Sequence, residues 1–162
     1  MRRQRGRRAS GYCSKFEERI AKELTDAEVE YEYEPIQLEY DECLRKNRAR
    51  CADCGSTDLL RTGWYTPDFV LANGLDIETK GLFTAADRRK MLAVIEHHPD
   101  RTFVLLFMKD NTLSKLTFTR YSDWCIKYGI DYSIGQLKPE WLTYVKPTDT
   151  GTESNSRSTE NG

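Results

Sequence analysis

Two carboxylates and a lysine flank a short turn near the middle of the sequence. Asp68 ends the stretch YTPD, and Glu78 and Lys80 follow in ETK, with Asn73-Gly74 between the two stretches. An Asn-Gly pair between two runs of apolar residues predicts a β-hairpin. Carboxylate oxygens are hard ligands that suit Mg²⁺ or Mn²⁺, and a nearby ammonium stabilises developing negative charge. The combination is typical of metal-assisted phosphodiester hydrolysis.

The register of this hairpin follows from its hydrophobic pattern. A loop of the Asn and Gly alone would mix apolar and charged side chains on each face. A three-residue loop, 72–74, with Gly74 in a left-handed conformation, opposes Asp68 to Glu78 and separates the two kinds of side chain. The apolar face then holds Phe69, Leu71, Leu75 and Ile77, and the polar face holds Asp68, Asp76, Glu78 and Lys80.

Two interpretations of the polar face remain open at this point. It could be an ordinary solvated sheet face, with Glu78 and Lys80 as a surface ion pair. The opposed like charges of Asp68 and Glu78 favour the other interpretation, because two ionised carboxylates about 5 Å apart repel each other unless a cation lies between them.

The elements around the hairpin predict a small α/β or α+β domain with a mixed sheet flanked by helices. Ser14 and Thr84 are expected to cap two helices, with Glu17 and Asp87 completing capping boxes. Gly129 is expected to end a third helix. In order, we expect a helix after Ser14, a strand at 29–33, the hairpin at 66–80, a helix at 85–97, a strand buried on both faces at 102–108, a helix at 121–128 and a turn from Pro139.

The chain of 162 residues is long enough for one domain, which we place at 12–146. Residues 1–11 are expected to form a flexible basic arm and residues 147–162 a disordered tail. No apolar run could span a membrane and no secretory signal is present, so a cytoplasmic location is expected.

Two groups of basic residues are candidates for binding DNA phosphates. A solvated surface without a partner explains each group almost as well. The net charge of −1 argues against non-specific coating of nucleic acid. The candidates are Arg2, Arg3, Arg5, Arg7 and Arg8 in the arm, and Arg88, Arg89 and Lys90 early in the helix at 85–97.

A cluster of cysteines interrupts the domain in a polar segment, 39–63, which we expect to be an inserted and locally braced loop. Cys43, Cys51 and Cys54 have the spacing of a zinc knuckle. Tetrahedral zinc needs a fourth ligand, for which Cys13, Cys125 and Asp41 are candidates. Reduced, metal-free cysteines are the alternative.

Several motifs in one order resemble the phage endonuclease I family, which comprises four-way (Holliday) junction resolvases with a PD-(D/E)xK nuclease core. The similarity runs from about Tyr12 to Leu142 and is broken by the cysteine-bearing segment. The motifs are GYCSKFEERIAKEL, YEYE, YTPDF, NGLDIETKGL, ADRRK, HP, WCIKYGI and PEWL.

The resemblance implies four catalytic residues, Glu17, Asp68, Glu78 and Lys80. It further implies two divalent metal ions per active site, Mg²⁺ or Mn²⁺, held by the three carboxylates, and an intertwined homodimer whose first helix completes the partner's site. Its implied activity is paired cleavage of branched double-stranded DNA that leaves 5′-phosphates. Two alternatives stay open: a nicking nuclease directed by DNA structure or mismatches, and a non-catalytic zinc-knuckle DNA-binding module.

Overall fold

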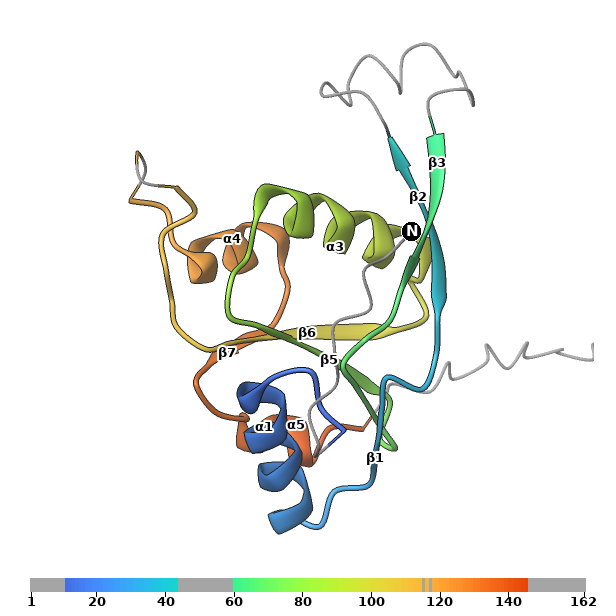
Figure 1. Cartoon of the computed structure of the whole chain (residues 1–162), viewed down its shortest axis with the longest axis vertical. Helices are drawn as coiled ribbons and strands as arrows, with labels where there is room; N and C mark the ends of the chain where they lie inside the picture. The colour runs from blue at the N-terminus through green and yellow to red at the C-terminus, as the bar shows by residue number, and fades with distance from the viewer. Residues whose placement is uncertain (1–10, 44–59, 115, 117, 146–162) are drawn as a thin grey trace, which may run out of the picture.

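A five-stranded mixed sheet forms the centre of the computed structural model (Figure 1), which describes residues 11–43, 60–114, 116 and 118–145. The strand order is β1-β4-β5-β6-β7, antiparallel between β1, β4 and β5 and parallel from β5 to β7. The bounds are β1 Tyr31–Tyr33, β4 Phe69–Leu71, β5 Leu75–Lys80, β6 Thr102–Phe107 and β7 Tyr132–Ile134. The expected mixed sheet is confirmed.

Helices cover both faces of this sheet. Figure 1 shows α1 and α5 on one side, and α3 and α4 on the other. The helices are α1 Lys15–Asp26, α3 Ala85–His97, α4 Tyr121–Tyr128 and the single turn α5 Pro139–Leu142. No helix in the described part of the chain is long and apolar enough to cross a membrane.

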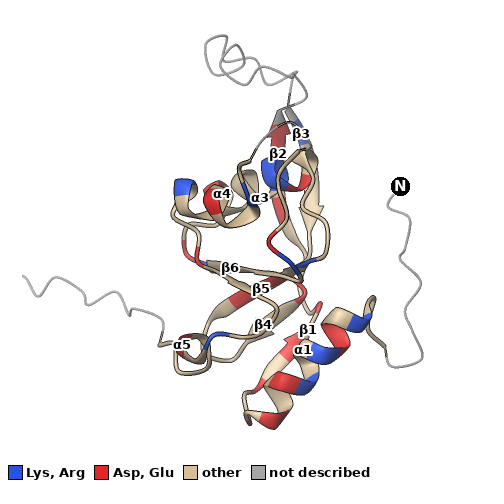
Figure 2. Ribbon diagram, turned by 90° about the vertical axis from the view of Figure 1, so that its left-hand side faces the viewer, with Lys and Arg blue, Asp and Glu red and all other residues tan. Residues whose placement is uncertain are grey.

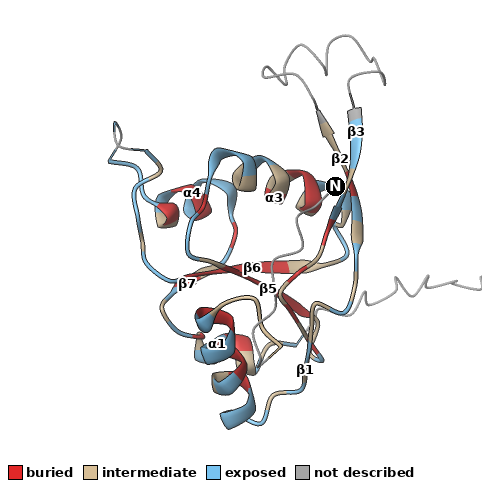
Figure 3. Ribbon diagram, viewed as in Figure 1, coloured by how far each residue is buried: buried red, intermediate tan, exposed pale blue. Residues whose placement is uncertain are grey.

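The sheet separates two hydrophobic cores, and β6 supplies side chains to both. Phe103, Leu105 and Phe107 enter the core beneath α3 and α4, while Val104 and Leu106 enter the core beneath α1. The strand is buried along nearly its whole length (Figure 3), as its continuous apolar sequence predicts. Each such side chain contributes about 1.5–3 kcal/mol when fully buried.

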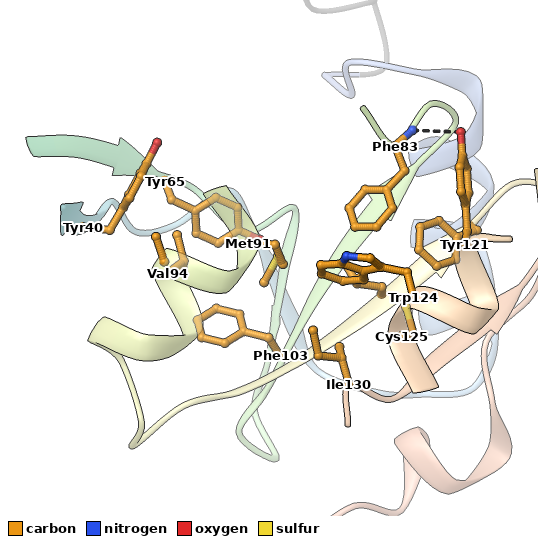
Figure 4. Close-up of a cluster of buried hydrophobic side chains, with 13 residues drawn as sticks. Tyr40, Tyr65, Phe83, Met91, Val94, Phe103, Tyr121, Trp124, Cys125 and Ile130 are labelled. Atoms are coloured by element: carbon orange, nitrogen blue, oxygen red, sulfur yellow. Dashed lines mark hydrogen bonds between the residues drawn. The ribbon is translucent and has the colours of Figure 1, made fainter. Parts of the chain in front are cut away.

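Aromatic rings dominate the core beneath α3 and α4 (Figure 4). Phe83 packs edge-on against Trp124 and Tyr121, with ring centroids 4.9 and 5.6 Å apart. The hydroxyl of Tyr121 accepts a hydrogen bond from the Phe83 amide at 3.1 Å. This core therefore fixes the chain that leaves β5 directly after Lys80.

A two-stranded antiparallel sheet stands beside the main one. Its strands are β2 Leu38–Cys43 and β3 Leu60–Tyr65, paired from Leu38 with Tyr65 to Cys43 with Leu60. The prediction of a loop over 39–63 was therefore wrong at both ends, and residues 44–59 lie outside the described chain. The pair packs on α3, where a ring nitrogen of His98 lies 2.7 Å from the Glu39 carbonyl oxygen.

Most of the predicted helix ends are confirmed. The Ser14 side chain accepts a hydrogen bond from the Glu17 amide, Thr84 and Asp87 form a complete capping box, and Gly129 is left-handed with φ of 66°. The capping box at Ser14 is only half formed, because the Glu17 carboxylate binds the Cys13 amide instead of the Ser14 amide. Strand β7 was not predicted.

Candidate active site

The β4–β5 hairpin has the register that its apolar residues predict. Phe69 pairs with Ile77 and Val70 with Asp76, and Gly74 adopts a φ of 95°. The Gly74 amide closes the turn by donating to the Leu71 carbonyl at 3.0 Å. Asp68 and Glu78 therefore start from opposing positions at the open end of the hairpin.

Asp68 is held across the hairpin by Thr79. Its Oδ2 accepts hydrogen bonds from the Thr79 amide at 2.7 Å and from the Thr79 hydroxyl at 2.6 Å. Burial raises the pKa of Asp68 well above its usual value, and the charge of Glu78 raises it further, whereas Thr79 and Lys80 lower it. The Asp68 carboxylate is thus held in position close to the negative charge of Glu78. The positive charge of Lys80 does not cancel the combined effect of burial and Glu78 on the Asp68 pKa.

Glu78 receives two hydrogen-bond donors, one on each oxygen. The buried Tyr65 hydroxyl donates to Oε2 at 2.6 Å, and the Lys80 ammonium binds Oε1. Burial opposes the charged form of Lys80, but the charge and the hydrogen bond of Glu78 outweigh burial and raise the lysine pKa. The charged form of Lys80 is therefore favoured at this site.

The polar face of the hairpin is not a solvated surface. Glu78 is 4% exposed and Asp76 2%, and Tyr65 of β3 packs against Glu78 through a hydrogen bond. Asp76 has a dedicated partner, Arg101, whose Nε and Nη2 each lie 2.6 Å from one of its oxygens. Its charge is thereby neutralised, which separates Asp76 from the pair Asp68 and Glu78.

The chemistry of Asp68 and Glu78 fits a divalent metal ion. Their oxygens are hard donors, and burial, followed by the charge of Glu78, raises the pKa of Asp68. Within the described residues, no group of three or more His, Cys, Asp and Glu side chains converges into a metal site. Asp68 and Glu78 would therefore hold a metal ion together with water or phosphate oxygens.

Glu17 is not gathered with these two carboxylates in the single chain. It lies on α1, 5% exposed, and its Oε2 accepts from the Tyr33 hydroxyl at 2.6 Å and from the Cys13 amide at 3.0 Å. Tyr33 pairs with Phe69, the residue after Asp68. Glu17 is thus connected to the start of β4 by way of Tyr33 in β1.

The predicted DNA-binding residues of α3 differ in their surroundings. Arg88 donates to the Phe83 carbonyl at 2.8 Å, and the Lys90 ammonium lies 5.2 Å from the centre of the Tyr65 ring. Arg89 is exposed. Figure 2 colours the basic residues blue and the acidic residues red along the chain. Arg2, Arg3, Arg5, Arg7 and Arg8 lie outside the described residues.

The cysteines predicted to bind zinc cannot be placed together. Cys51 and Cys54 lie outside the described residues, and only the backbone of Cys43 is described. Cys125 is buried in the aromatic core, where burial raises its pKa to about 12. Asp41, two residues before Cys43, lies beside His97, with 3.8 Å between Asp41 Oδ2 and His97 Nε2. The structure thus brings His97 to the strand that ends at Cys43, the first cysteine of the cluster.

Three residues of the site were missed by sequence reasoning: Tyr65, Thr79 and Tyr33. Thr79 could have been found from the hairpin alone, since it lies between Glu78 and Lys80. Tyr65 belongs to β3 and Tyr33 to β1, so their contacts with Glu78 and Glu17 depend on long-range packing that no local pattern reports.

Comparison with known proteins identifies the family of the chain. The family model of phage endonuclease I matches residues 59–154, which include the whole hairpin. Endonuclease I of Escherichia phage T7 is 30% identical over 141 residues, 86% of this chain and 84% of the relative. Endodeoxyribonuclease 1 of Enterobacteria phage T3 is 34% identical over 120 residues, 74% of this chain and 68% of the relative. With Asp68, Glu78 and Lys80 on the matched hairpin, the chain belongs to the phage endonuclease I family.

Proposed function

We propose that the protein is a metal-dependent endodeoxyribonuclease that resolves four-way DNA junctions by paired strand cleavage, leaving 5′-phosphates. The observation that carries this proposal is the hairpin register, which opposes Asp68 to Glu78 and ends in Lys80, whose ammonium binds Glu78. Membership of the phage endonuclease I family supports cleavage of DNA, as the name of the T3 relative states for that protein.

Each side chain has a separate role in the proposed hydrolysis. Asp68 and Glu78 hold Mg²⁺ or Mn²⁺, which when bound supplies Lewis-acid polarisation of the phosphate and lowers the pKa of water. Thr79 keeps Asp68 pointed at the site through two hydrogen bonds. Lys80 offers its ammonium to the negative charge that grows on the phosphate as the P–O bond breaks.

A homodimer would extend this site. We propose that two metal ions are held when Glu17 from a partner chain joins Asp68 and Glu78, as the family resemblance implies. Two hydrogen-bond donors of Glu17, Cys13 and Tyr33, belong to the same N-terminal segment that carries α1 and β1, which supports exchange of this segment between chains as one unit. A two-fold dimer would present two sites to the opposing strands of a junction.

Cleavage of branched and linear DNA tests the function directly. The protein is incubated with a four-way junction or with a linear duplex of the same arm sequence, with Mg²⁺ or with chelator. We expect paired, symmetric cuts near the branch that require metal and disappear in Asp68→Ala. Equal cutting of both substrates would contradict junction resolution and would favour the less selective nicking nuclease. Tight junction binding without cleavage under Mg²⁺ or Mn²⁺ would favour the non-catalytic module.

A mixing experiment tests the shared active site. Glu17→Gln and Asp68→Asn chains are each inactive if both residues are catalytic. In a mixed dimer with shared sites, one site carries both substitutions and the other carries none, so the mixture should nick junctions. If each chain uses its own Glu17, every site carries one substitution and the mixture stays inactive. Glutamine at 17 retains the hydrogen bond from Tyr33, which limits loss of folding.

We further propose a structural zinc ion bound by Cys43, Cys51 and Cys54 and contact between the basic arm and DNA phosphates. Metal analysis of the purified protein should find one zinc per chain, lost in Cys51→Ser.

Removal of residues 1–8 should weaken junction binding and reduce its dependence on salt, because fewer phosphate charges are neutralised. An intracellular location is part of the same proposal, since reduced cysteines suit zinc binding.

A further inference from the structure

The two oxygens of Glu78 have different neighbours. Oε2 faces the Tyr65 hydroxyl, which is 2.6 Å away and belongs to a side chain that is only 1% exposed. Oε1 faces Lys80, whose side chain is 15% exposed. One oxygen is therefore bound from the interior of the protein and the other from the side that solvent reaches.

Tyr65 is held firmly in its place at the end of β3. Its ring packs edge-on against Phe103, with centroids 6.1 Å apart, and the Lys90 ammonium lies 5.2 Å above it. The buried phenol donates its hydrogen bond to Glu78, since a buried hydroxyl without a partner is costly.

The two donors on Glu78 differ in their freedom to leave. Lys80 has a flexible stem with several rotatable bonds, so its ammonium can exchange Oε1 for another anion, such as a phosphate. Tyr65 has two side-chain torsions and is surrounded by core atoms, so its hydroxyl cannot turn away without opening the core. A cation that approaches Glu78 therefore finds Oε1 bound by a donor that can move away and Oε2 bound by a donor that cannot.

We propose that Tyr65 is a positioning residue that restricts Glu78 to binding a divalent cation through one oxygen, and so makes the site selective for small ions. Mg²⁺ requires near-octahedral geometry with one oxygen from each ligand, whereas Ca²⁺ takes six to eight oxygens and often binds both oxygens of a carboxylate. A carboxylate with one oxygen held by a phenol suits Mg²⁺ or Mn²⁺ and disfavours Ca²⁺. This inference rests on the proposed role of Glu78 as a metal ligand.

Direct metal binding to Tyr65→Phe tests the inference without reference to cleavage. Free Mn²⁺ is followed by electron paramagnetic resonance during titration of the full chain, and Ca²⁺ is then added as a competitor. We expect Mn²⁺ to bind roughly tenfold more weakly, as is typical when a hydrogen bond to a metal ligand is removed. Ca²⁺ should lose no affinity, so selectivity for Mn²⁺ over Ca²⁺ falls by the same factor. Equal losses for both ions, or no change, would overturn the inference.

Tyr121→Phe is the matched control. It also removes a buried tyrosine hydroxyl with a hydrogen-bond partner, but the partner is the Phe83 amide, at 3.1 Å. This variant should bind both ions as the wild type does. If its selectivity falls as far as that of Tyr65→Phe, general loosening of the core explains the effect and the inference fails.

Two further variants separate this inference from the proposed function. Asp68→Asn and Glu78→Gln should lose Mn²⁺ binding if these residues hold the metal. If both bind Mn²⁺ normally, the proposed metal site itself is wrong. If both lose it while Tyr65→Phe keeps wild-type selectivity, only the role of Tyr65 is wrong.

The wild-type protein offers a measurement that does not depend on the folding of Tyr65→Phe. Infrared difference spectra between the Mg²⁺-bound and metal-free states report the splitting of the two carboxylate stretches, and Glu78→Gln identifies the bands of Glu78. A wide splitting, characteristic of coordination through one oxygen, is expected. A narrow splitting, characteristic of coordination through both oxygens, would overturn the inference.

Discussion

Phe69 lies directly opposite Ile77 in the β4–β5 hairpin, and this pairing sets where Asp68 and Glu78 stand. Both apolar side chains are fully buried against α1, so a slip of one residue would turn them toward the other face and carry the carboxylates away from each other. The geometry of the site is therefore enforced by the core on the opposite side of the same strands.

Gly74 is expected to be essential for this register. Its φ of 95° is strained for any residue with a side chain, so Gly74→Ala should lower the free energy of unfolding by about 1–2 kcal/mol. Urea denaturation followed by circular dichroism measures the loss. Gly81→Ala is the control, because a Cβ there would meet only Met108 Cε at 3.9 Å. Equal stability of Gly74→Ala and wild type would show that the turn is not strained.

Asp68→Asn should stabilise the metal-free protein while abolishing metal-dependent cleavage. The substitution removes one of two opposed negative charges and retains the oxygen that accepts from Thr79, so a gain of about 0.5–1 kcal/mol is expected. Unfolding is measured in chelator at neutral pH. The direction agrees with the raised pKa of Asp68. A carboxyl whose pKa is higher in the folded protein stabilises the fold below pH 3.8, and this stabilisation is lost as the pH rises through the folded-state pKa.

A control for this prediction removes a negative charge elsewhere. Glu30 is exposed, so Glu30→Gln should change the metal-free stability by less than about 0.5 kcal/mol. If Asp68→Asn were less stable than wild type in chelator, the hydrogen bonds from Thr79 would outweigh the repulsion by Glu78. The site would then be organised without metal.

The ion pair of Asp76 and Arg101 should be among the most important polar contacts for stability. Asp76 is 2% exposed, and Arg101 binds both of its oxygens at 2.6 Å. Arg101→Leu leaves a buried carboxylate without its cation and should cost about 3–5 kcal/mol in the free energy of unfolding. Arg101→Lys should lose less, because a single ammonium can retain part of the attraction.

An exposed pair provides the comparison for Arg101. Lys22 and Asp26 form an ion pair on α1 whose side chains are 72% and 62% exposed. Lys22→Ala should cost less than about 1 kcal/mol, because water screens the charges. A loss as small as this in Arg101→Leu would contradict the importance of the pair and would mean that other groups or water compensate the charge of Asp76.

Asp131 should make the attachment of α5 sensitive to acid. Burial raises its pKa, but hydrogen bonds from Lys138 and from Trp141 Nε1, each at 2.5 Å, together lower it below the usual 3.8. Because the folded-state pKa is lowered, this stabilisation is present above about pH 4 and disappears as the pH falls through the folded value. Asp131→Asn should therefore be less stable than wild type from pH 5 to 8, with the difference shrinking below pH 4. A difference that stays constant down to pH 2 would exclude the ionised carboxylate as its source.

Sequence patterns predicted the elements whose signals are local. The hairpin register follows from four apolar residues in adjoining strands, and the caps at Ser14 and Thr84 from a hydroxyl at the start of each helix. Strand β6 follows from its uninterrupted apolar run. In each of these cases the residues that decide the structure are close together in the chain.

The features that sequence reasoning missed depend on distant partners. Strands β2 and β3 pair across residues 44–59, and the Tyr40 ring lies over Gly63, a contact that no periodicity reports. Strand β7 has only three residues and forms by parallel pairing with β6. Glu17 had the spacing of a capping-box acid, but the Tyr33 hydroxyl reaches it from β1 and changes its partners.

The pairing of Cys43 with Leu60 has a consequence for how this enzyme family can vary. The chain leaves β2 and re-enters β3 at adjoining backbone positions, so a longer connection between them costs little extra loop-closure entropy, and we expect it to leave Tyr65 and the hairpin in place. The junction between these two strands is thus a natural grafting point. We expect a recognition module, a purification tag or a fluorescent reporter inserted there to remain attached to the nuclease core without changing the positions of Asp68 and Glu78.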